Sequence, residues 1–153
     1  MFDLFADETL YRLLHIWFGV VWIGTLYYFN FMQTPFMAEA AATAKPEILT
    51  KLLPRAMWWF RWAAKATFIS GLALFWYKYA DSMRGGDFMG TGGGMLITLG
   101  MLLGFTMYMN VWCIIWPAQK VVIKNAKDVA EGKPANPEAA NKAARAAAAD
   151  EFI

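Results

Sequence analysis

The chain has 153 residues, of which 59% are hydrophobic and 17% are charged. This balance is more apolar than that of an ordinary globular domain and indicates contact with lipid. The formal net charge of +2 excludes a strongly basic surface for nucleic acid. A single cysteine, Cys113, excludes both an intramolecular disulfide and a CxxCH site for covalent haem attachment, so any haem has to be bound non-covalently.

The first long apolar stretch, residues 10–32, carries no formal charge after Arg12. As an α-helix it is long enough to cross the roughly 30 Å hydrocarbon core of a bilayer, so it predicts a first membrane span. Pro35 is expected to end this helix, because a proline has no backbone N–H to donate. Gly19 and Gly24 within the span are expected to let another helix pack closely.

A polar, alanine-rich segment, residues 37–53, predicts a loop with one short interfacial helix. The second span, residues 56–79, is unusual because it holds Arg61 and Lys65 near its first turns. Both side chains are within reach of the membrane edge, so we favour the interpretation that they snorkel to the lipid headgroups. The alternative is that they bind an anion or a partner.

Residues 81–94 contain six glycines and predict a flexible loop. No strand precedes this run and no Gly-Lys-Ser/Thr element follows it, so it is not a phosphate-binding loop. The third span, residues 95–116, is expected to stop at Pro117. It carries Gly100 and Gly104 at the small-xxx-small spacing that favours close packing of helices.

The C-terminal segment, residues 120–153, is polar and rich in alanine. Asn136 followed by Pro137 is typical of a helix start, because Asn caps the free N–H groups and Pro fits the first turn. This pattern predicts a short surface helix near the C-terminus. The elements together predict an all-α integral membrane protein, with a three-helix transmembrane domain over residues 1–119 and a tail over residues 120–153.

The basic residues beside the spans indicate how the chain is oriented in the membrane. Lys45, Lys51 and Arg55 lie between the first two spans and further lysines follow the third, whereas the N-terminus and the glycine-rich loop carry few cations. By the positive-inside rule, the N-terminus lies outside and the C-terminus inside. The sequence therefore predicts a multi-pass protein of the bacterial cytoplasmic (inner) membrane, in contact with the lipid bilayer.

The one histidine, His15, lies about two turns into the first span. An ionisable group inside a bilayer is costly to bury and is commonly functional. Gly19 and Trp22 share its helical face and leave a notch that suits a flat macrocycle, so His15 is a candidate ligand of haem b iron. Met95 and Met101 of the third span lie at a similar depth and are candidates for the sixth ligand, since His/Met ligation is an established arrangement.

Other interpretations of these residues stay open. His15 could instead form an interhelical hydrogen bond to a backbone carbonyl or to Thr98, or form a quinone pocket with nearby tryptophans. No further metal site is expected, because Cys113 has no second Cys or His at ligand spacing and is predicted to be a small buried hydrophobe. No Ser-His-Asp set can be assembled, so the chain is not expected to be catalytic alone.

Three stretches together resemble the membrane domain of the bacterial membrane-bound urate hydroxylase (urate oxidase N-terminal) family. They contain the motifs His-x3-Gly-x2-Trp-x-Gly from residue 15, Trp-Trp-Phe-Arg-Trp from residue 58, and Asn-Val-Trp-x3-Trp-Pro-x-Gln-Lys from residue 110. The resemblance covers most of residues 10–125. It implies a membrane oxidoreductase domain in a short form, because longer members carry more membrane helices and a C-terminal cytochrome c domain.

The first of these motifs is also similar to the first helix of small haem-binding membrane proteins, such as the membrane protoporphyrinogen oxidase and the copper-resistance D proteins. That similarity carries over only to His15 and to Lys65, and a second histidine ligand is missing.

The leading functional hypothesis is a small accessory subunit of a bacterial inner-membrane electron-transfer or oxidoreductase complex, whose spans pack against larger subunits. The alternative is a haem-b-binding membrane redox protein or oxidase that uses His15. Asp3, Asp7 and Glu8 could form an acidic patch for a soluble cationic partner, and a cytochrome c is one such partner.

Overall fold

The computed structural model describes residues 8–84 and 88–150, and within these ranges every regular element is a helix. The elements join into three long rods and one short helix. The first rod contains α1 (Glu8–Tyr27), the π-helical segment η1 (Tyr28–Gln33) and α2 (Thr34–Glu39). The second contains α3 (Lys45–Glu47), η2 (Ile48–Leu52) and α4 (Leu53–Arg84); the third contains α5 (Gly92–Asn110), η3 (Val111–Ile115) and α6 (Trp116–Ala130).

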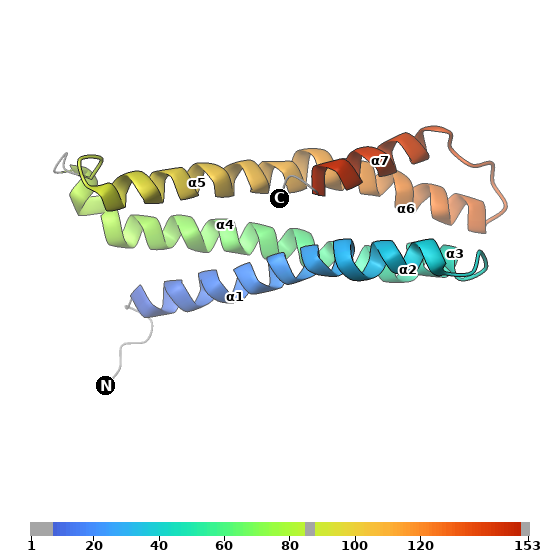
Figure 1. The fold of residues 1–153 in the computed structure, drawn as a ribbon, viewed down its shortest axis with the longest axis horizontal. Coiled ribbons are helices and arrows are strands. Elements are labelled where there is room, and N and C mark those ends of the chain that lie inside the picture. Colours follow the sequence, from blue (N-terminus) through green and yellow to red (C-terminus); the bar gives the residue numbers. More distant parts are fainter. Residues whose placement is uncertain (1–7, 85–87, 151–153) are drawn as a thin grey trace.

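The three rods lie side by side, with α4 between α1 and α5 in the view of Figure 1. The α1 helix packs along α4 over much of its length, whereas α5 meets α4 at few points. The short helix α7 (Glu138–Asp150) folds back onto α6 and η3. Its predicted start is confirmed, because the N–H of Glu138 donates to Oδ1 of Asn136 over 2.9 Å, with Pro137 between them.

Each long rod places a proline directly after a π-helical segment. In these segments N–H groups bond five residues back: Thr34 donates to the carbonyl of Phe29, and Trp116 to that of Val111. A proline ring inside an α-helix clashes with the carbonyl four residues earlier, and the wider π turn makes room for it. The prediction that Pro35 and Pro117 end their helices is therefore wrong, because both helices continue past them.

The segments between the rods are shorter than the sequence predicted. The short helix expected within residues 37–53 is present as α3 and η2, but it joins α4 without a break. The glycine-rich run is helical at both ends, since α4 reaches Arg84 and α5 begins at Gly92. Gly94 has a specific steric role there, because a Cβ at this position would lie only 1.9 Å from the carbonyl oxygen of Phe88. Residues 85–87 lie outside the described ranges.

The buried core fills the centre of the bundle, where the first two rods meet η3. Its members are apolar residues of all three rods: Trp22, Leu26, Phe29, Leu53, Met57, Phe60, Ala63, Ala64, Val111, Ile115 and Ile123. The ring of Phe60, fully enclosed, meets that of Phe29 edge-on with a centroid separation of 5.5 Å. Two small residues on α4, Ala63 and Ala64, allow the close approach of α1.

Two of the rods, Glu8–Glu39 and Gly92–Ala130, are long and apolar enough to cross a membrane. Only 6% of the most apolar window of each is buried inside the structure. Large apolar side chains therefore cover their outer faces, as at Trp17 and Leu96, which are 68% and 71% exposed. Lipid would remove this surface from water, and the fold itself does not.

We expect Phe60→Ala to lower the free energy of unfolding by about 3 kcal/mol, because it leaves a cavity where the three rods meet. Its neighbour Trp59 is 59% exposed, so Trp59→Ala is the matched control and should change the value by less than about 0.5 kcal/mol. Chemical denaturation in a mild detergent, followed by circular dichroism, measures both. Equal losses in the free energy of unfolding for the two variants would contradict the assignment of Phe60 to the core.

Candidate functional site

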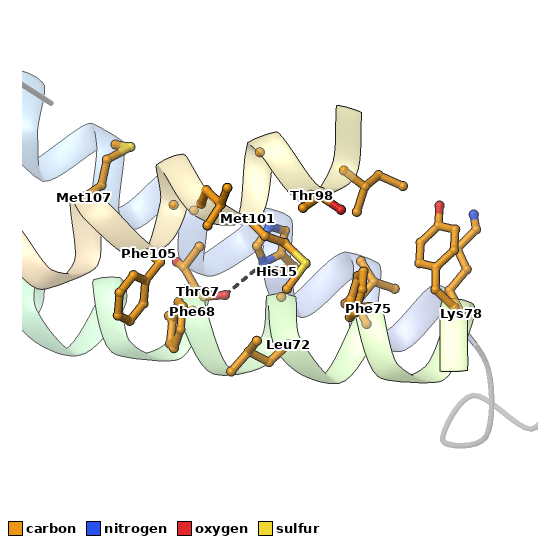
Figure 2. A pocket seen from close by; sticks show the side chains of 18 of the residues that line it. His15, Thr67, Phe68, Leu72, Phe75, Lys78, Thr98, Met101, Phe105 and Met107 are labelled. Carbon is orange, nitrogen blue, oxygen red and sulfur yellow. Dashed lines mark hydrogen bonds between the residues drawn. The ribbon is translucent and has the colours of Figure 1, made fainter. Parts of the chain in front are cut away.

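A cavity of about 1120 Å³ separates α5 from the paired helices α1 and α4. Most of its wall is apolar, and four glycines contribute to it: Gly19 from α1, Gly71 from α4, and Gly100 and Gly104 from α5. His15 lies on the wall opposite α5 (Figure 2). Pockets that enclose small molecules commonly have this character, with apolar walls and a few polar groups.

Aromatic side chains cluster near both ends of the cavity. At one end the ring of Phe88 packs on those of Phe75 and Tyr79, with centroids 5.6 Å and 5.1 Å away. At the other end Phe68 stacks on Tyr108 of α5, with centroids 4.6 Å apart and ring planes 8° from parallel. The ring of Phe105 on α5 also contacts Phe68, with centroids 5.9 Å apart, and the cavity lies between this cluster and that of Phe88.

The imidazole of His15 rests on a seat formed by α4. Its Nδ1 lies 2.9 Å from the backbone carbonyl oxygen of Thr67 and 3.4 Å from Oγ of Ser70. The ring lies directly over Gly71, where an added Cβ would come within 2.9 Å of Cε1. The hydroxyls of Thr67 and Ser70 donate to α4's own carbonyls, at Ala63 and Ala66, so neither hydroxyl donates its proton to the imidazole.

This seat determines which ring nitrogen carries the proton. A carbonyl oxygen only accepts hydrogen bonds, so the proton lies on Nδ1 and is donated to Thr67. Nε2 then has an unshared electron pair, and no hydrogen bond to it forms in the described part of the chain. Histidines that bind metals are oriented in this way, with one N–H held by a carbonyl and the other nitrogen free.

The predicted interhelical hydrogen bond from His15 is confirmed, and its acceptor is a backbone carbonyl. The other proposed partner, Thr98, also lines the cavity but donates to the carbonyl of Gly94. Met101 lines the cavity and in Figure 2 extends from α5 toward His15. Met95 is 62% exposed and does not contribute to the cavity wall, so the structure brings only Met101 together with His15.

The predicted packing glycines have different surroundings. A Cβ at Gly19 would lie 3.8 Å from the side chain of Thr67, an ordinary contact between α1 and α4. A Cβ added at Gly24, Gly100 or Gly104 would have no heavy atom within 4 Å. Gly100 and Gly104 line the cavity instead. Close helix packing is therefore not seen at these three glycines within the described residues.

Arg61 and Lys65 do not line this cavity; they lie nearer the start of α4, beside Trp112 and Trp116 of the third rod. The guanidinium Cζ of Arg61 is 3.4 Å from the ring centroid of Trp116. The Nζ of Lys65 is 5.0 Å from the ring centroid of Trp62. Both side chains stack on tryptophans, which is a favourable cation–π arrangement. Cys113, on η3 nearby, is exposed, so the prediction that it is buried is wrong.

The rim of the cavity nearest the N-terminus carries charged residues. Glu8 accepts a hydrogen bond from Nζ of Lys78 over 3.0 Å and forms an ion pair with Arg12 on its own helix. Lys78 and then Arg12 hold the pKa of the Glu8 carboxyl below its usual value. Arg12 and Lys78 also line the cavity. Of the predicted acidic patch, Asp3 and Asp7 lie outside the described residues, and Glu8 is paired within the chain.

Two residues that the sequence reasoning missed, Thr67 and Gly71, form the histidine seat. A signal was present, because the run Thr67 to Gly71 places small and polar residues in the middle of an otherwise bulky apolar span. Such residues let backbones approach and expose carbonyl oxygens to a neighbouring helix. No group of three or more His, Cys, Asp or Glu side chains that could hold a metal ion occurs in residues 8–84 and 88–150.

These features define a helical protein with a histidine facing an apolar cavity. Comparison with known protein families, curated proteins and solved structures gives no match for this chain. The resemblance to the urate hydroxylase membrane domain stays a prediction from the sequence motifs.

We expect Gly71→Ala to displace the imidazole of His15, because the new Cβ would come within 3.1 Å of Nδ1. Overpacking of this kind typically costs about 1–3 kcal/mol. Gly19→Ala is the matched control: its Cβ meets only an ordinary contact at 3.8 Å, and the higher helix propensity of alanine should make it neutral or stabilising by up to about 1 kcal/mol. Denaturation in detergent and the ¹⁵N shifts of His15 test both, and an unchanged imidazole signal in Gly71→Ala would contradict this seat.

Proposed function

We propose that the chain is a three-span protein of the bacterial cytoplasmic membrane that binds haem b at His15 and transfers electrons as a subunit of an oxidoreductase complex. The observation that carries the proposal is the hydrogen bond from His15 Nδ1 to Thr67, which leaves Nε2 free beside a large apolar cavity. The exposed faces of the rods and the residues that line the cavity support the other parts of the proposal.

The placement in the membrane is supported by the exposed apolar faces of two rods. The second rod carries Arg61 and Lys65 and is less apolar, but it lies between the other two (Figure 1). Three spans over residues 10–32, 56–79 and 95–116 put the first connection and the C-terminal tail on the cytosolic side, where their basic residues belong. The rods exceed the roughly 30 Å hydrocarbon core, so their remaining turns project into the cytosol.

The cavity suits haem b in shape and in donor chemistry. The glycine seat under His15 and the glycines of α5 leave flat walls, and the imidazole offers the unprotonated nitrogen that iron requires. Met101 offers a thioether from the opposite wall, which would complete His/Met ligation. Arg12 and Lys78 give the rim positive charge, which suits the two propionate carboxylates of haem b. Bound haem b would supply reversible one-electron chemistry.

The residues around the cavity would protect and tune such a group. Thr67 fixes the orientation of the imidazole through its carbonyl. The aromatic clusters around Phe75 and Phe68 lie at the two ends of the cavity. An apolar surrounding and a His/Met ligand pair are two of the features by which a protein sets a haem potential. Electron transfer to a larger subunit or to a cytochrome c is consistent with these features.

A second candidate function is an accessory subunit without haem, in which a helix of a larger subunit fills the cavity. Gly100 and Gly104 favour it, because their small-xxx-small face is open within the described residues. In that case His15 has only the interhelical role. The two candidates differ in the absorption spectrum of the isolated chain, since only the first predicts a bound haem.

We expect the chain purified from haem-supplied cells to show a Soret band, and His15→Ala to reduce bound haem at least about tenfold. Met101→Leu should keep the Soret band but lose the low-spin features of a six-coordinate iron. Met95→Leu is the control for Met101 and should change neither, because Met95 lies outside the cavity. The absence of a Soret band, or a band of equal strength in His15→Ala, would refute haem ligation by this residue.

The proposed topology predicts which connections are accessible from each side. In a Cys113→Ala background, Thr43→Cys and Lys133→Cys should react with a membrane-impermeant maleimide only after the membrane is opened. Gly90→Cys should react in intact spheroplasts, since it lies in the connection before α5. Labelling of all three from the same side would contradict a three-span arrangement.

A further inference from the structure

Three cations gather over tryptophan rings where α4 meets η3 and α6. Besides the stack of Arg61 on Trp116, the Nζ of Lys120 lies 5.6 Å from the same ring centroid. Arg61 and Lys65 both face the ring of Trp112, each at 5.8 Å from its centroid. None of these three cations forms an ion pair with a carboxylate in the described residues, so the cluster has a net charge of about +3 at neutral pH.

The charged heads of Arg61 and Lys65 point toward the proposed cytosolic end of α4, and Lys120 of α6 reaches back in the other direction, to Trp116. The Nε–H of Arg61 donates to the carbonyl of Met57, one turn back toward the start of α4, over 3.2 Å. Lys65 likewise reaches back, to the ring of Trp62. Side chains of an α-helix lean toward its N-terminus, which for α4 is the proposed inner side of the membrane. The predicted snorkelling would therefore bring both cations to the depth of the inner headgroups.

The cluster is rich in donors and lacks acceptors. The guanidinium of Arg61 keeps its remaining N–H groups, and the indole Nε1 of Trp112 is a buried donor without a partner in the structure. Cations in a low-dielectric environment need a counter-charge, and cation–π contacts compensate only part of the cost. A phosphate group accepts several hydrogen bonds at once and pairs well with guanidinium.

The surface beside the cluster is apolar on the side that faces the membrane interior. One turn beyond Lys65 on α4 lies Ile69, 54% exposed, and on α5 lies Phe105, 48% exposed. Trp62 itself is 44% exposed. A ligand with a phosphate at one end and an acyl chain at the other matches this arrangement, whereas a free phosphate or an acidic peptide would leave the apolar strip uncovered.

We infer that Arg61, Lys65 and Lys120, seated on Trp62, Trp112 and Trp116, bind the phosphate of an anionic phospholipid of the inner leaflet. Phosphatidylglycerol is the probe we choose, because its headgroup carries one negative charge and no compensating cation. The inference rests on the proposed placement in the membrane but not on haem binding. A bound lipid at this position would neutralise cations that the described residues leave unpaired and would cover the exposed apolar side chains beside them.

Native mass spectrometry of the full chain in mild detergent, titrated with phosphatidylglycerol or with phosphatidylcholine, tests this site. We expect the wild-type chain to prefer phosphatidylglycerol, and each of Arg61→Gln, Lys65→Gln and Lys120→Gln to weaken this lipid by about fivefold without affecting phosphatidylcholine. Lys124→Gln is the matched control, because Lys124 is an exposed lysine of the same helix α6 as Lys120 and no aromatic ring lies beneath it in the described residues. Its effect should be less than about twofold.

Several outcomes would overturn the lipid site. Equal binding of the two lipids by the wild-type chain would do so, as would an equal loss in Lys124→Gln and Lys120→Gln. Displacement of phosphatidylglycerol by inorganic phosphate at about 10 mM would indicate a free-phosphate site instead. Flotation with pure phosphatidylcholine vesicles tests the membrane placement separately. A chain that floats with these vesicles but does not prefer phosphatidylglycerol refutes only the lipid site.

Discussion

The hydrogen bond from His15 to the carbonyl of Thr67 joins the first two rods at the level of the cavity. It requires that α1 and α4 approach closely enough for an imidazole to lie on a backbone, and Gly71 makes this approach feasible. The same bond assigns the proton to one nitrogen and leaves the other facing the cavity. Because the cavity separates α5 from α1 and α4, the imidazole of His15 faces open space on this side rather than close packing with a third helix.

The charged groups of the bundle are arranged by the cost of removing charge from water. At the N-terminal end Glu8 pairs with Arg12 and Lys78, so one carboxylate serves two cations that line the cavity rim. At the other end Arg61 and Lys65 have tryptophan faces and no carboxylate in the structure described. An aromatic face offsets only part of the cost of removing a cation from water, and it contacts only one side of the cation. The N–H groups on the other sides stay available to a ligand. The two ends therefore differ in what they can still bind.

Much of the helical content was predictable from apolar length, and so was the start of α7, because Asn136 and Pro137 form a local signal that needs no tertiary contact. The ends of the rods were not predictable in this way. A proline stops an α-helix, but a preceding π turn relieves its clash, and the apolar length of a span does not indicate that such a turn forms. The candidate site was predictable only in part: His15 stood out as a lone ionisable group, whereas its seat depends on which face of α4 meets α1. The exposure of Cys113 likewise depends on the rotation of η3.

The π-helical segments have a consequence for how the chain tolerates length changes. A π turn contains one residue more than an α turn, so side chains beyond it are rotated by about 100° relative to an uninterrupted helix. The apolar stripe of each rod thus has two registers, one on each side of η1, η2 or η3. Removing a single residue from one of these segments would restore regular α geometry but would turn everything beyond it to a different face. Insertions and deletions should therefore be tolerated in the connections at 40–44 and 131–137, whereas the interior of each rod should keep its residue count.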